Sequence, residues 1–280
     1  MIAVIVINYR SPELTIRFVI EECVKIQEEH VVIVVDNAST EESFDKLKHT
    51  LPDAVILRSA ENQGFARANN QGSNYAIKEY HPEFILFTNN DISFRDSNVV
   101  DALISEMRKH PEVGIMGPQV LGLDGKRQSP NADKSFAQRF LWPTWGKMLY
   151  NKATLNRKTY RDYKVNAQEG TCGWVSGCFF IVSTDSFEQV GGFDPATFLY
   201  GEEQILTARF ARVGKSVYFF PRVTVIHEQG ATSNKYYASL KLRLMEFKSV
   251  AYYYRHYAGT PSWEILLGRI TLWLNIVRGK

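Results

Sequence analysis

Acidic and amide side chains directly follow two apolar runs of the sequence. Asp36 and Asn37 end the run in VVDNAST, and Asn89, Asn90 and Asp91 end the run in TNND. A carboxylate such as Asp36 can accept hydrogen bonds from a ribose or a pyrimidine N–H, although a turn at a strand end would use one equally well. Mg²⁺ is usually held by one or two carboxylates together with substrate phosphates. Asp91 is therefore a candidate metal ligand, with a polar turn as the alternative.

A glycine-containing segment, NQGFARANN at residues 62–70, precedes a helical pattern. Gly64 permits a tight loop, and the N–H groups at a helix N-terminus favour an anion such as a diphosphate. Arg67 could add a charge-assisted contact. An ordinary loop with a surface arginine explains the same segment, so the residues alone leave both interpretations open.

Two adjacent glutamates and a histidine complete the candidates. Glu202 and Glu203 begin a predicted helix in YGEEQIL, where either could be the general base that deprotonates an acceptor hydroxyl. Acidic residues at a helix start also complement the helix dipole without any catalytic role. His227 follows an apolar run in VTVIHEQG. A neutral imidazole there could bind the metal or contact a diphosphate, although a lone histidine is more often structural.

The elements that must position these residues are an alternation of strands and helices. The predicted strands are residues 2–7, 31–35, 54–57 and 84–87, and the predicted helices start after Ser11, after Thr40 and at residue 65. This alternation predicts an α/β fold with a mainly parallel central sheet flanked by helices, whose ligands sit at the carboxyl ends of the strands. Asn8, Asp36 and Asp91 would meet there because each follows a strand.

The second half of the chain is less regular. Residues 124–170 are rich in polar and turn-forming residues and are predicted to form a loop-rich insertion or an acceptor-facing segment. The further predicted elements are a strand at 175–182, a helix at 201–213, and two short strands at 216–220 and 223–226.

Residues 235–280 form a basic, aromatic-rich tail. They contain eight Lys or Arg and two Glu, a net charge of +6, so residues 1–234 carry 3 − 6 = −3. Helices are predicted in the tail, and the apolar stripe of one helix consists of Trp263, Leu266, Leu267, Ile270, Trp273, Leu274 and Val277, beside Arg269, Arg278 and Lys280. The stripe could lie on the inner face of a membrane, pack on the preceding domain, or join copies of the chain.

The composition is that of a globular protein. The 280 residues, 45% hydrophobic and 22% charged, allow one large domain or two small ones. Three cysteines without a CxxC pair predict reduced thiols in the cytoplasm. We expect no signal peptide, since the first apolar run has no basic flank, and no stretch reaches the roughly 20 apolar residues of a membrane span. No nucleic-acid-binding motif is present, so nucleic acid is not an expected partner.

The order of the candidate segments resembles that of family 2 glycosyltransferases with the GT-A fold, especially their rhamnosyltransferase-like bacterial branch. The matching strings are VVDNAST, NQGFARANNQG, TNND, GWVSGCFFIVSTDSFEQVGGFDPATFLYGEEQIL and VIHEQGATS. The resemblance implies a GT-A domain at residues 1–234 followed by the helical tail. It also implies an inverting transfer from a dTDP- or UDP-linked sugar to a glycan or lipid-linked glycan, in cell-surface glycan biosynthesis.

The resemblance also implies site residues. Nucleotide-sugar contacts are implied for Asn8, Asp36, Asn37, Gly64, Arg67, Asn70, Asn89, Asn90, Trp174, Ser176 and Gly177. Asp91, at the last position of a DXD-like motif, would bind Mg²⁺ or Mn²⁺, and His227 would approach the metal or the diphosphate. Glu203, the second member of the acidic pair, looks like the catalytic base of this family, with Glu202 as the alternative.

Three other functions compete with this one. A catalytically inactive nucleotide-sugar-binding module would bind the donor without consuming it. A sugar-phosphate nucleotidyltransferase is disfavoured because NYRSPEL, rather than a glycine-rich basic loop, follows the first strand. A nicotinamide dehydrogenase is disfavoured because G-x-G-x-x-G is missing at the same place.

Overall fold

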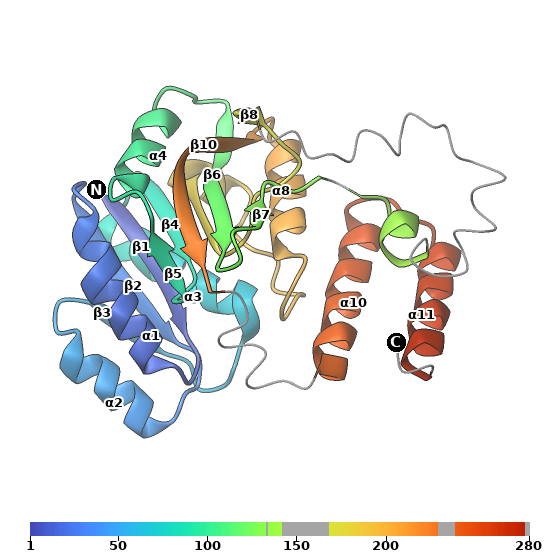
Figure 1. Cartoon of the computed structure of the whole chain (residues 1–280), viewed down its shortest axis with the longest axis horizontal. Helices are drawn as coiled ribbons and strands as arrows, with labels where there is room; N and C mark the ends of the chain where they lie inside the picture. The colour runs from blue at the N-terminus through green and yellow to red at the C-terminus, as the bar shows by residue number, and fades with distance from the viewer. Residues whose placement is uncertain (133, 142–167, 229–238, 278–280) are drawn as a thin grey trace.

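The computed structural model describes residues 1–132, 134–141, 168–228 and 239–277 (Figure 1). Most of the predicted insertion at 124–170, the predicted domain boundary at 234, and the basic residues Lys235, Arg278 and Lys280 lie outside the described residues.

One sheet organises the fold. Its strands are β1 (Ile2–Asn8), β2 (His30–Asp36), β3 (Val55–Arg58), β4 (Phe84–Thr88), β5 (Ile92–Phe94), β6 (Val113–Gly122), β7 (Arg127–Ser129), β8 (Gly170–Thr171), β9 (Phe179–Ser183) and β10 (Ser216–His227). The order is β3-β2-β1-β4-β9-β6-β10-β5, with β7 beside β6 and β8 beside β10. Neighbours β3, β2, β1 and β4 are parallel, as are β6 and β10, whereas β9 and β5 are antiparallel to their neighbours. The sheet is therefore mainly parallel but mixed.

Helices cover both faces of this sheet. The α-helices are α1 (Pro12–Arg17), α2 (Glu41–Thr50), α3 (Gly64–Tyr80), α4 (Val99–Met107), α7 (Thr184–Gln189), α8 (Glu202–Arg212), α10 (Ser239–His256) and α11 (Ser262–Val277). One core cluster packs α2, α4 and the π-turn after α1 on one sheet face, and a second packs α3, α7 and α8 on the other. The alternating Val and Ile side chains of β1 enter both clusters, which explains why its sequence is a continuous apolar run.

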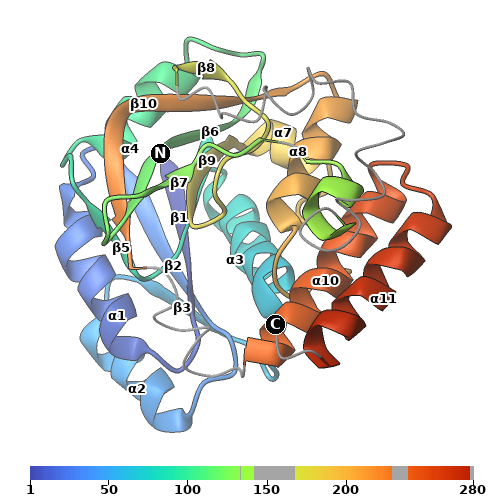
Figure 2. The same cartoon turned by 45° about the vertical axis from the view of Figure 1, so that its right-hand side comes forward.

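The tail is helical, as predicted. α10 and α11 lie side by side, next to α8 (Figures 1 and 2). A third, smaller cluster joins them to the π-turn η3 (Ala137–Leu141) through Phe136, Phe247, Val250 and Tyr254. No helix in the described part of the chain has the length and hydropathy needed to cross a membrane.

Several elements differ from the sequence prediction. The strand predicted at 175–182 begins only at Phe179, and residues 175–178 are loop. The two short strands predicted at 216–226 are one strand, β10, whose pairing with β6 slips between Phe220 and Thr224. Strands β5 and β6 and helix α4 were not predicted. They extend the sheet beyond β9 and place β10 beside the polar end of β4.

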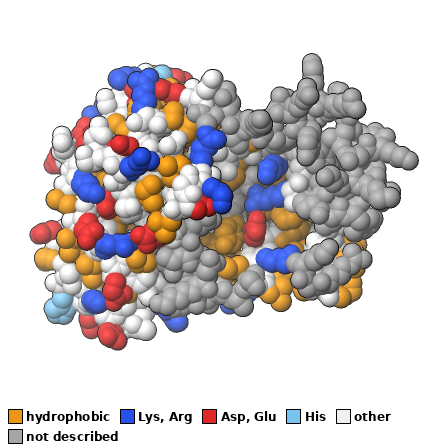
Figure 3. Space-filling model, in the orientation of Figure 1, with side chains coloured by type: hydrophobic (Ala, Val, Ile, Leu, Met, Phe, Trp, Pro, Cys, Tyr) orange, Lys and Arg blue, Asp and Glu red, His pale blue; other side chains and the backbone are white. Residues whose placement is uncertain are grey.

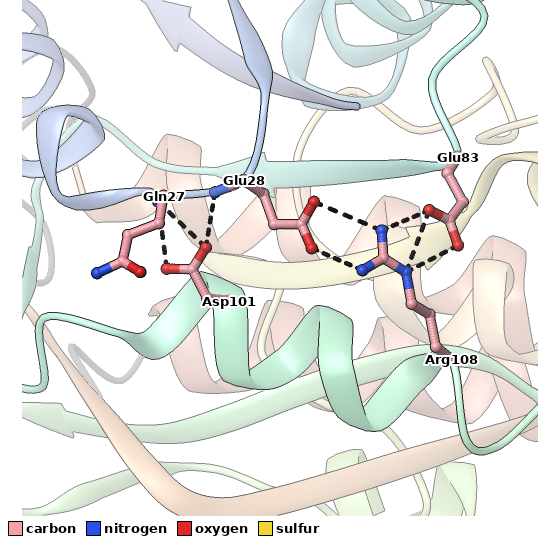
Figure 4. A network of polar contacts seen from close by, with 5 residues as sticks. All are labelled: Gln27, Glu28, Glu83, Asp101 and Arg108. Atoms are coloured by element: carbon pink, nitrogen blue, oxygen red, sulfur yellow. Dashed lines mark hydrogen bonds and ion pairs between the residues drawn. The ribbon is translucent and has the colours of Figure 1, made fainter.

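The amino ends of two strands are held together by a polar network (Figure 4). Arg108, just after α4, lies 2.6 Å from Glu28 and 2.7 Å from Glu83, which precede β2 and β4. Asp101 of α4 accepts the backbone N–H groups of Gln27 and Glu28. These contacts join the amino ends of β2 and β4 to α4. The polar candidate residues lie at the opposite, carboxyl ends of the strands.

Gly72 of α3 should tolerate no side chain. A Cβ at this position would lie 2.7 Å from Cγ2 of Ile5 and 3.0 Å from Cγ2 of Val35. Glycine to alanine in a helix normally stabilises by roughly 0.5–1 kcal/mol. We expect Gly72→Ala to lower the free energy of unfolding instead, by about 1 kcal/mol, because overpacking a rigid core costs more. Urea denaturation measures this. The exposed Asn74→Ala, two residues later, is the control and should be neutral or stabilising; a stabilised Gly72→Ala would disprove the contact.

Candidate active site

A cavity of about 680 Å³ opens at the carboxyl ends of β1, β2, β4 and β10. Eleven of the predicted site residues line it, namely Asn37, Gly64, Asn89, Asn90, Asp91, Trp174, Ser176, Gly177, Glu202, Glu203 and His227. Residues that are 190 positions apart in the chain therefore share one wall. Their convergence is what the strand-end rule for parallel sheets predicts.

Asn8 and Asp36 lie beneath the cavity rather than in its wall. Both side chains are fully buried, and Asn8 Nδ2 donates to Asp36 Oδ1 over 2.7 Å. Asn8 Oδ1 accepts from Thr15, whose hydroxyl in turn accepts from Asn90 Nδ2. The nucleoside contact predicted for Asn8 and Asp36 stays a prediction. In the structure these two residues tie the ends of β1, β2 and β4 together, and the neighbouring amide Asn37, itself buried, lines the cavity.

The start of α3 is largely satisfied by protein groups. The N–H groups of Gln63, Gly64 and Phe65 donate to Asn37 Oδ1, Asn62 Oδ1 and the carbonyl of Phe198, over 2.8–3.0 Å. These amides are not free for a diphosphate, so the anion site predicted from the helix N-terminus is not formed by them. Gly64 lines the cavity for another reason: a Cβ there would lie 2.2 Å from the carbonyl oxygen of Phe198.

Arg67 and Asn70 face away from the cavity. Arg67 Nε donates to the carbonyl of Pro195 over 3.0 Å. Asn70 makes a pair of hydrogen bonds with the backbone N–H and carbonyl of Phe193, each 2.9 Å long. These two side chains fix the loop that leads into Glu202 and Glu203, and the nucleotide-sugar contact predicted for them stays a prediction.

Asp91 and His227 face each other across β4 and β10. His227 Nε2 lies 3.3 Å from Asp91 Oδ1 and 3.3 Å from Asn89 Nδ2, and its Nδ1 lies 2.7 Å from Gln128 Oε1. Burial opposes a charge on the imidazole, but Asp91 and Cys178 outweigh this and raise the pKa of His227 to about 10. The 3.3 Å approach allows a protonated imidazole to form an ion pair with the Asp91 carboxylate.

These residues fit a divalent cation in part. Asp91 Oδ1 is buried and faces His227 Nε2 at 3.3 Å without forming a hydrogen bond of normal geometry, and the side-chain amide of Asn89 lines the same cavity. No group of three or more His, Cys, Asp or Glu side chains in the described ranges is arranged to hold a metal unaided. A cation at Asp91 would need further oxygen ligands, which the phosphates of a nucleotide provide.

Glu202 and Glu203 project from the first turn of α8. Tyr200 and Gly201 precede them with φ of 72° and 82°, a left-handed pair that is costly for a tyrosine and turns the chain sharply into the helix. Burial, followed by repulsion from Glu203, raises the pKa of Glu202 to about 8. Burial also raises the pKa of Glu203, although the Gly177 N–H, which donates to Glu203 Oε1 over 3.2 Å, opposes this.

Unsatisfied polar atoms gather at this cavity. Four buried side-chain atoms in the described part of the chain have no hydrogen-bond partner, and three of them, Asp91 Oδ1, Trp174 Nε1 and Glu202 Oε2, belong to cavity-lining residues. Leaving such a group unpaired costs roughly 1–3 kcal/mol. Their convergence indicates a place where a polar ligand completes the hydrogen bonding.

The sequence of residues 3–191 matches the family described as Glycosyl transferase family 2. The chain belongs to glycosyl transferase family 2. The glycosyltransferase is 25% identical over 216 residues to the N-acetylglucosaminyl-diphospho-decaprenol L-rhamnosyltransferase of Mycobacterium tuberculosis, covering 73% of this chain and 68% of that protein. It is 24% identical to the low-salt glycan biosynthesis hexosyltransferase Agl10 of Haloferax volcanii, covering 87% and 72%.

Solved structures confirm the GT-A fold. The mannosyltransferase PcManGT from Pyrobaculum calidifontis, in complex with GDP-Man and Mn²⁺, superimposes with a TM-score of 0.61 over 100% of this chain and 76% of its own. GalNAc-T7 with UDP, GalNAc and Mn²⁺ gives 0.59 over 81% and 43%. Both are 14% identical in sequence to the glycosyltransferase, so the likeness is one of fold.

Part of the cavity wall consists of residues that the sequence did not indicate. The additional lining residues are Ile7, Tyr9, Asn62, Phe65, Gln128, Asn131, Cys178, Phe198, Leu199 and Tyr200. Tyr9 and Asn62 adjoin predicted site residues and could have been included on that ground. Gln128 and Asn131 gave no signal, because they lie in an irregular segment that reaches the site only through β7 and an isolated bridge between Asn131 and Trp174.

Arg139 was also missed, although it contacts the acidic pair's helix. Its guanidinium donates to Gln204 Oε1 over 3.0 Å and pairs with Glu246 of α10 over 2.9 Å. Its charge counteracts the effect of burial on the pKa of Glu203. Arg139 therefore connects Glu246 of the tail to Gln204, the residue that follows the acidic pair.

The raised pKa of Glu202 predicts a pH-dependent stability. A buried group with a folded-state pKa of about 8 contributes stability that is complete below the ordinary pKa of glutamate, about 4.3, and is lost as the pH rises towards 8. Glu202→Gln, which mimics the neutral carboxyl, should remove this loss. The melting temperature of the variant should exceed that of the wild type at pH 8, and the difference should shrink towards pH 5. A difference in melting temperature between variant and wild type that stays the same from pH 5 to pH 8 would contradict a neutral Glu202.

Proposed function

We propose that this glycosyltransferase moves a sugar from a nucleoside-diphosphate sugar to an acceptor hydroxyl by a single inverting displacement. The observation that carries the proposal is the shared cavity in which Asp91, Trp174 and Glu202 each keep a buried polar atom that makes no hydrogen bond within the described ranges. The cavity requires a ligand with both donor and acceptor groups, and a sugar diphosphate has both. The proposed donor is UDP- or dTDP-linked, since the GalNAc-T7 structure contains UDP and the mycobacterial relative transfers L-rhamnose by name.

The proposed base is Glu203. Its carboxylate lies in the cavity wall, is partly accessible, and keeps its position through the Gly177 N–H. The acceptor oxygen attacks the anomeric carbon, the bond between that carbon and the diphosphate oxygen breaks, and Glu203 takes the hydroxyl proton. Glu202 is more deeply buried, and burial raises its pKa to about 8, so at neutral pH it is suited to donate a hydrogen bond.

The proposed metal ligands are Asp91 and His227, with Asn89 beside them. Mg²⁺ or Mn²⁺ held there would neutralise charge that develops on the departing diphosphate. The metal complexes of PcManGT and GalNAc-T7 support this assignment. His227 would give up its proton when it binds the cation, because only the neutral imidazole is a ligand.

The proposed acceptor is a glycan or a lipid-linked glycan. The named acceptor of the mycobacterial relative is N-acetylglucosaminyl-diphospho-decaprenol, a lipid-linked sugar, and the archaeal relative acts in glycan biosynthesis. The wall formed by Trp174, Ser176 and Tyr200 lies beside Glu203 in the same cavity and is the proposed acceptor side. We also propose that the glycosyltransferase acts in the cytoplasm, in the assembly of cell-surface glycans.

The proposal is tested by donor consumption. The purified chain is incubated with UDP- and dTDP-sugars and Mn²⁺, and the released nucleoside diphosphate is measured with and without EDTA. We expect release from at least one donor and its suppression by EDTA. Donor binding without any release, with every candidate acceptor, would identify a non-catalytic binding module instead.

Glu203→Gln should lower turnover by about 10²–10⁴-fold, the usual contribution of a general base. Donor affinity, measured by thermal shift with the nucleotide-sugar and Mn²⁺, should stay close to that of the wild type. The same measurements on Glu202→Gln decide between the two glutamates, since that variant should retain most of its turnover at neutral pH. The reverse ranking would assign the base to Glu202.

Gly177→Ala should impair turnover without unfolding the chain. A Cβ at residue 177 would lie 2.6 Å from Glu203 Oε1 and 2.8 Å from its Cγ, so the Glu203 side chain must move. Displacement of a catalytic group by about 1 Å can cost up to about 100-fold in rate. We expect turnover to fall by about 10- to 100-fold, with an unchanged melting temperature and donor affinity. Full activity in this variant would show that the position of Glu203 is unimportant.

A further inference from the structure

The outward face of α11 is more apolar than the face that packs on the protein. At about 100° per residue, its six exposed apolar side chains fall within an arc of about 120°. They are Trp263, Leu266, Leu267, Ile270, Trp273 and Val277, and Trp263 and Trp273 are 57% and 61% exposed. The side that packs on the protein carries the buried Gly268 and Thr271, together with Ile265 and Leu272. A Cβ at residue 268 would meet the ring of Phe136 at 2.4 Å, so this side is already tightly packed.

A helix on a globular domain turns its apolar stripe to the core and its polar residues to water. Helix α11 does pack on the protein through Ile265 and Leu272, but its larger apolar stripe faces outward. Leu240 and Leu244 of α10, 45% and 48% exposed, extend the exposed set to the neighbouring helix. A single exposed leucine needs no explanation, whereas a contiguous apolar face marks an interaction surface.

The charges of the helix pair have one sign where they are exposed. Lys241, Lys248 and Arg255 recur every seven residues along α10, which places them on one stripe, and all three are exposed. Arg243 and Arg269 are exposed as well. Figure 3 shows basic and hydrophobic side chains together over the visible part of the helix pair.

The two acidic residues of the helix pair do not offset this charge. Glu246 pairs with Arg139 over 2.9 Å. Glu264 is half-buried, and burial raises its pKa, opposed by a hydrogen bond from the backbone of Ala137. The described residues of α10 and α11 therefore carry five Lys or Arg against two Glu.

The helix pair is fixed to the catalytic domain. The hydroxyls of Tyr252 and Tyr257 donate to Asp194 Oδ2 over 3.1 and 2.5 Å. A Cβ at Gly201 would lie 3.5 Å from the backbone of Ser249, so α10 touches the residue that precedes the acidic pair. The outward face of α11 therefore has a fixed orientation relative to the cavity.

We infer that the outward face of α11, with the basic stripe of α10, binds the surface of a bilayer that contains anionic phospholipid. Tryptophan and leucine suit the boundary between headgroups and acyl chains, and the lysine and arginine side chains match negative headgroups. A helix of 16 residues is about 24 Å long and is held by its other face, so it lies in the interface and does not cross it. The inference is independent of which sugar is transferred. A docked chain would present its cavity at a fixed height above the lipid, where a lipid-linked acceptor is found.

The test is co-flotation of the full chain with vesicles of phosphatidylcholine alone or of phosphatidylcholine with phosphatidylglycerol. We expect the wild type to float with the anionic vesicles and to bind the neutral ones more weakly. Ile270→Glu/Trp273→Glu should weaken binding more than tenfold, since each side chain loses its apolar burial. The matched control is Val24→Glu/Leu123→Glu, which makes the same change at residues 71% and 77% exposed elsewhere, and should float like the wild type. Lys248→Gln/Arg255→Gln should weaken binding about fivefold per residue, and added salt should do likewise.

Two outcomes would overturn the inference. One is a wild type that stays at the bottom of the gradient with every vesicle composition, or an Ile270→Glu/Trp273→Glu variant that floats as well as the wild type. The other is a lipid-free wild type that is dimeric by light scattering and becomes monomeric in Ile270→Glu/Trp273→Glu, which would show that a second copy covers the face. Melting temperature and donor consumption without vesicles should be unchanged in these variants. A chain that floats but consumes no donor would contradict the proposed function and leave the membrane inference standing.

Discussion

The burial of carboxyl groups without full hydrogen bonding is the constraint on which the site depends. Asp91 and Glu202 each keep a buried oxygen without a partner in the described part of the chain. Such groups destabilise the fold, and they persist only where surrounding structure holds them in place. The sheet supplies that support through hydrogen bonds among Asn8, Asp36 and Thr15. These three side chains lie beneath the cavity and bond to one another.

Close backbone approaches determine where the acidic pair stands. Gly64 lets the carbonyl of Phe198 sit against α3, and Gly177 lets Glu203 sit against the loop before β9. Between them, the left-handed Tyr200 and Gly201 turn the chain into α8. Each glycine leaves out a side chain where two segments must touch, and the Gly177 N–H also donates a hydrogen bond to Glu203 Oε1.

The match to the family ends at residue 191, before the residues of the proposed chemistry are complete. Glu202, Glu203 and His227 follow it, and so do both tail helices. Arg139 links this later part to the earlier one, and Asp194 and Ser249 link the tail to the segment that leads into the acidic pair. The tail is thus joined to the segment that carries the acidic pair, which gives a physical route by which contacts of α11 could orient the cavity.

The sequence by itself determined the strands and helices up to the end of β4 at Thr88, the polar residues at the ends of the strands, and the family. Those features are local: a β-branched run, a proline after a cap, and a residue that follows a strand can be read without knowing what lies nearby. It also indicated the apolar stripe of α11, because helical periodicity is a property of the segment alone.

Only the tertiary structure decided which of these residues reach the cavity. Asn8, Asp36, Arg67 and Asn70 have the right types and spacing, yet their hydrogen bonds are made within the protein, and Gln128 and Asn131 enter from an irregular segment. Whether the stripe of α11 faced the core or the solvent was likewise undetermined, because periodicity shows that a face exists and not which way it turns. The physical reason is the same in each case: a side chain's exposure and partners are set by segments far away in the sequence, through packing that no local pattern encodes.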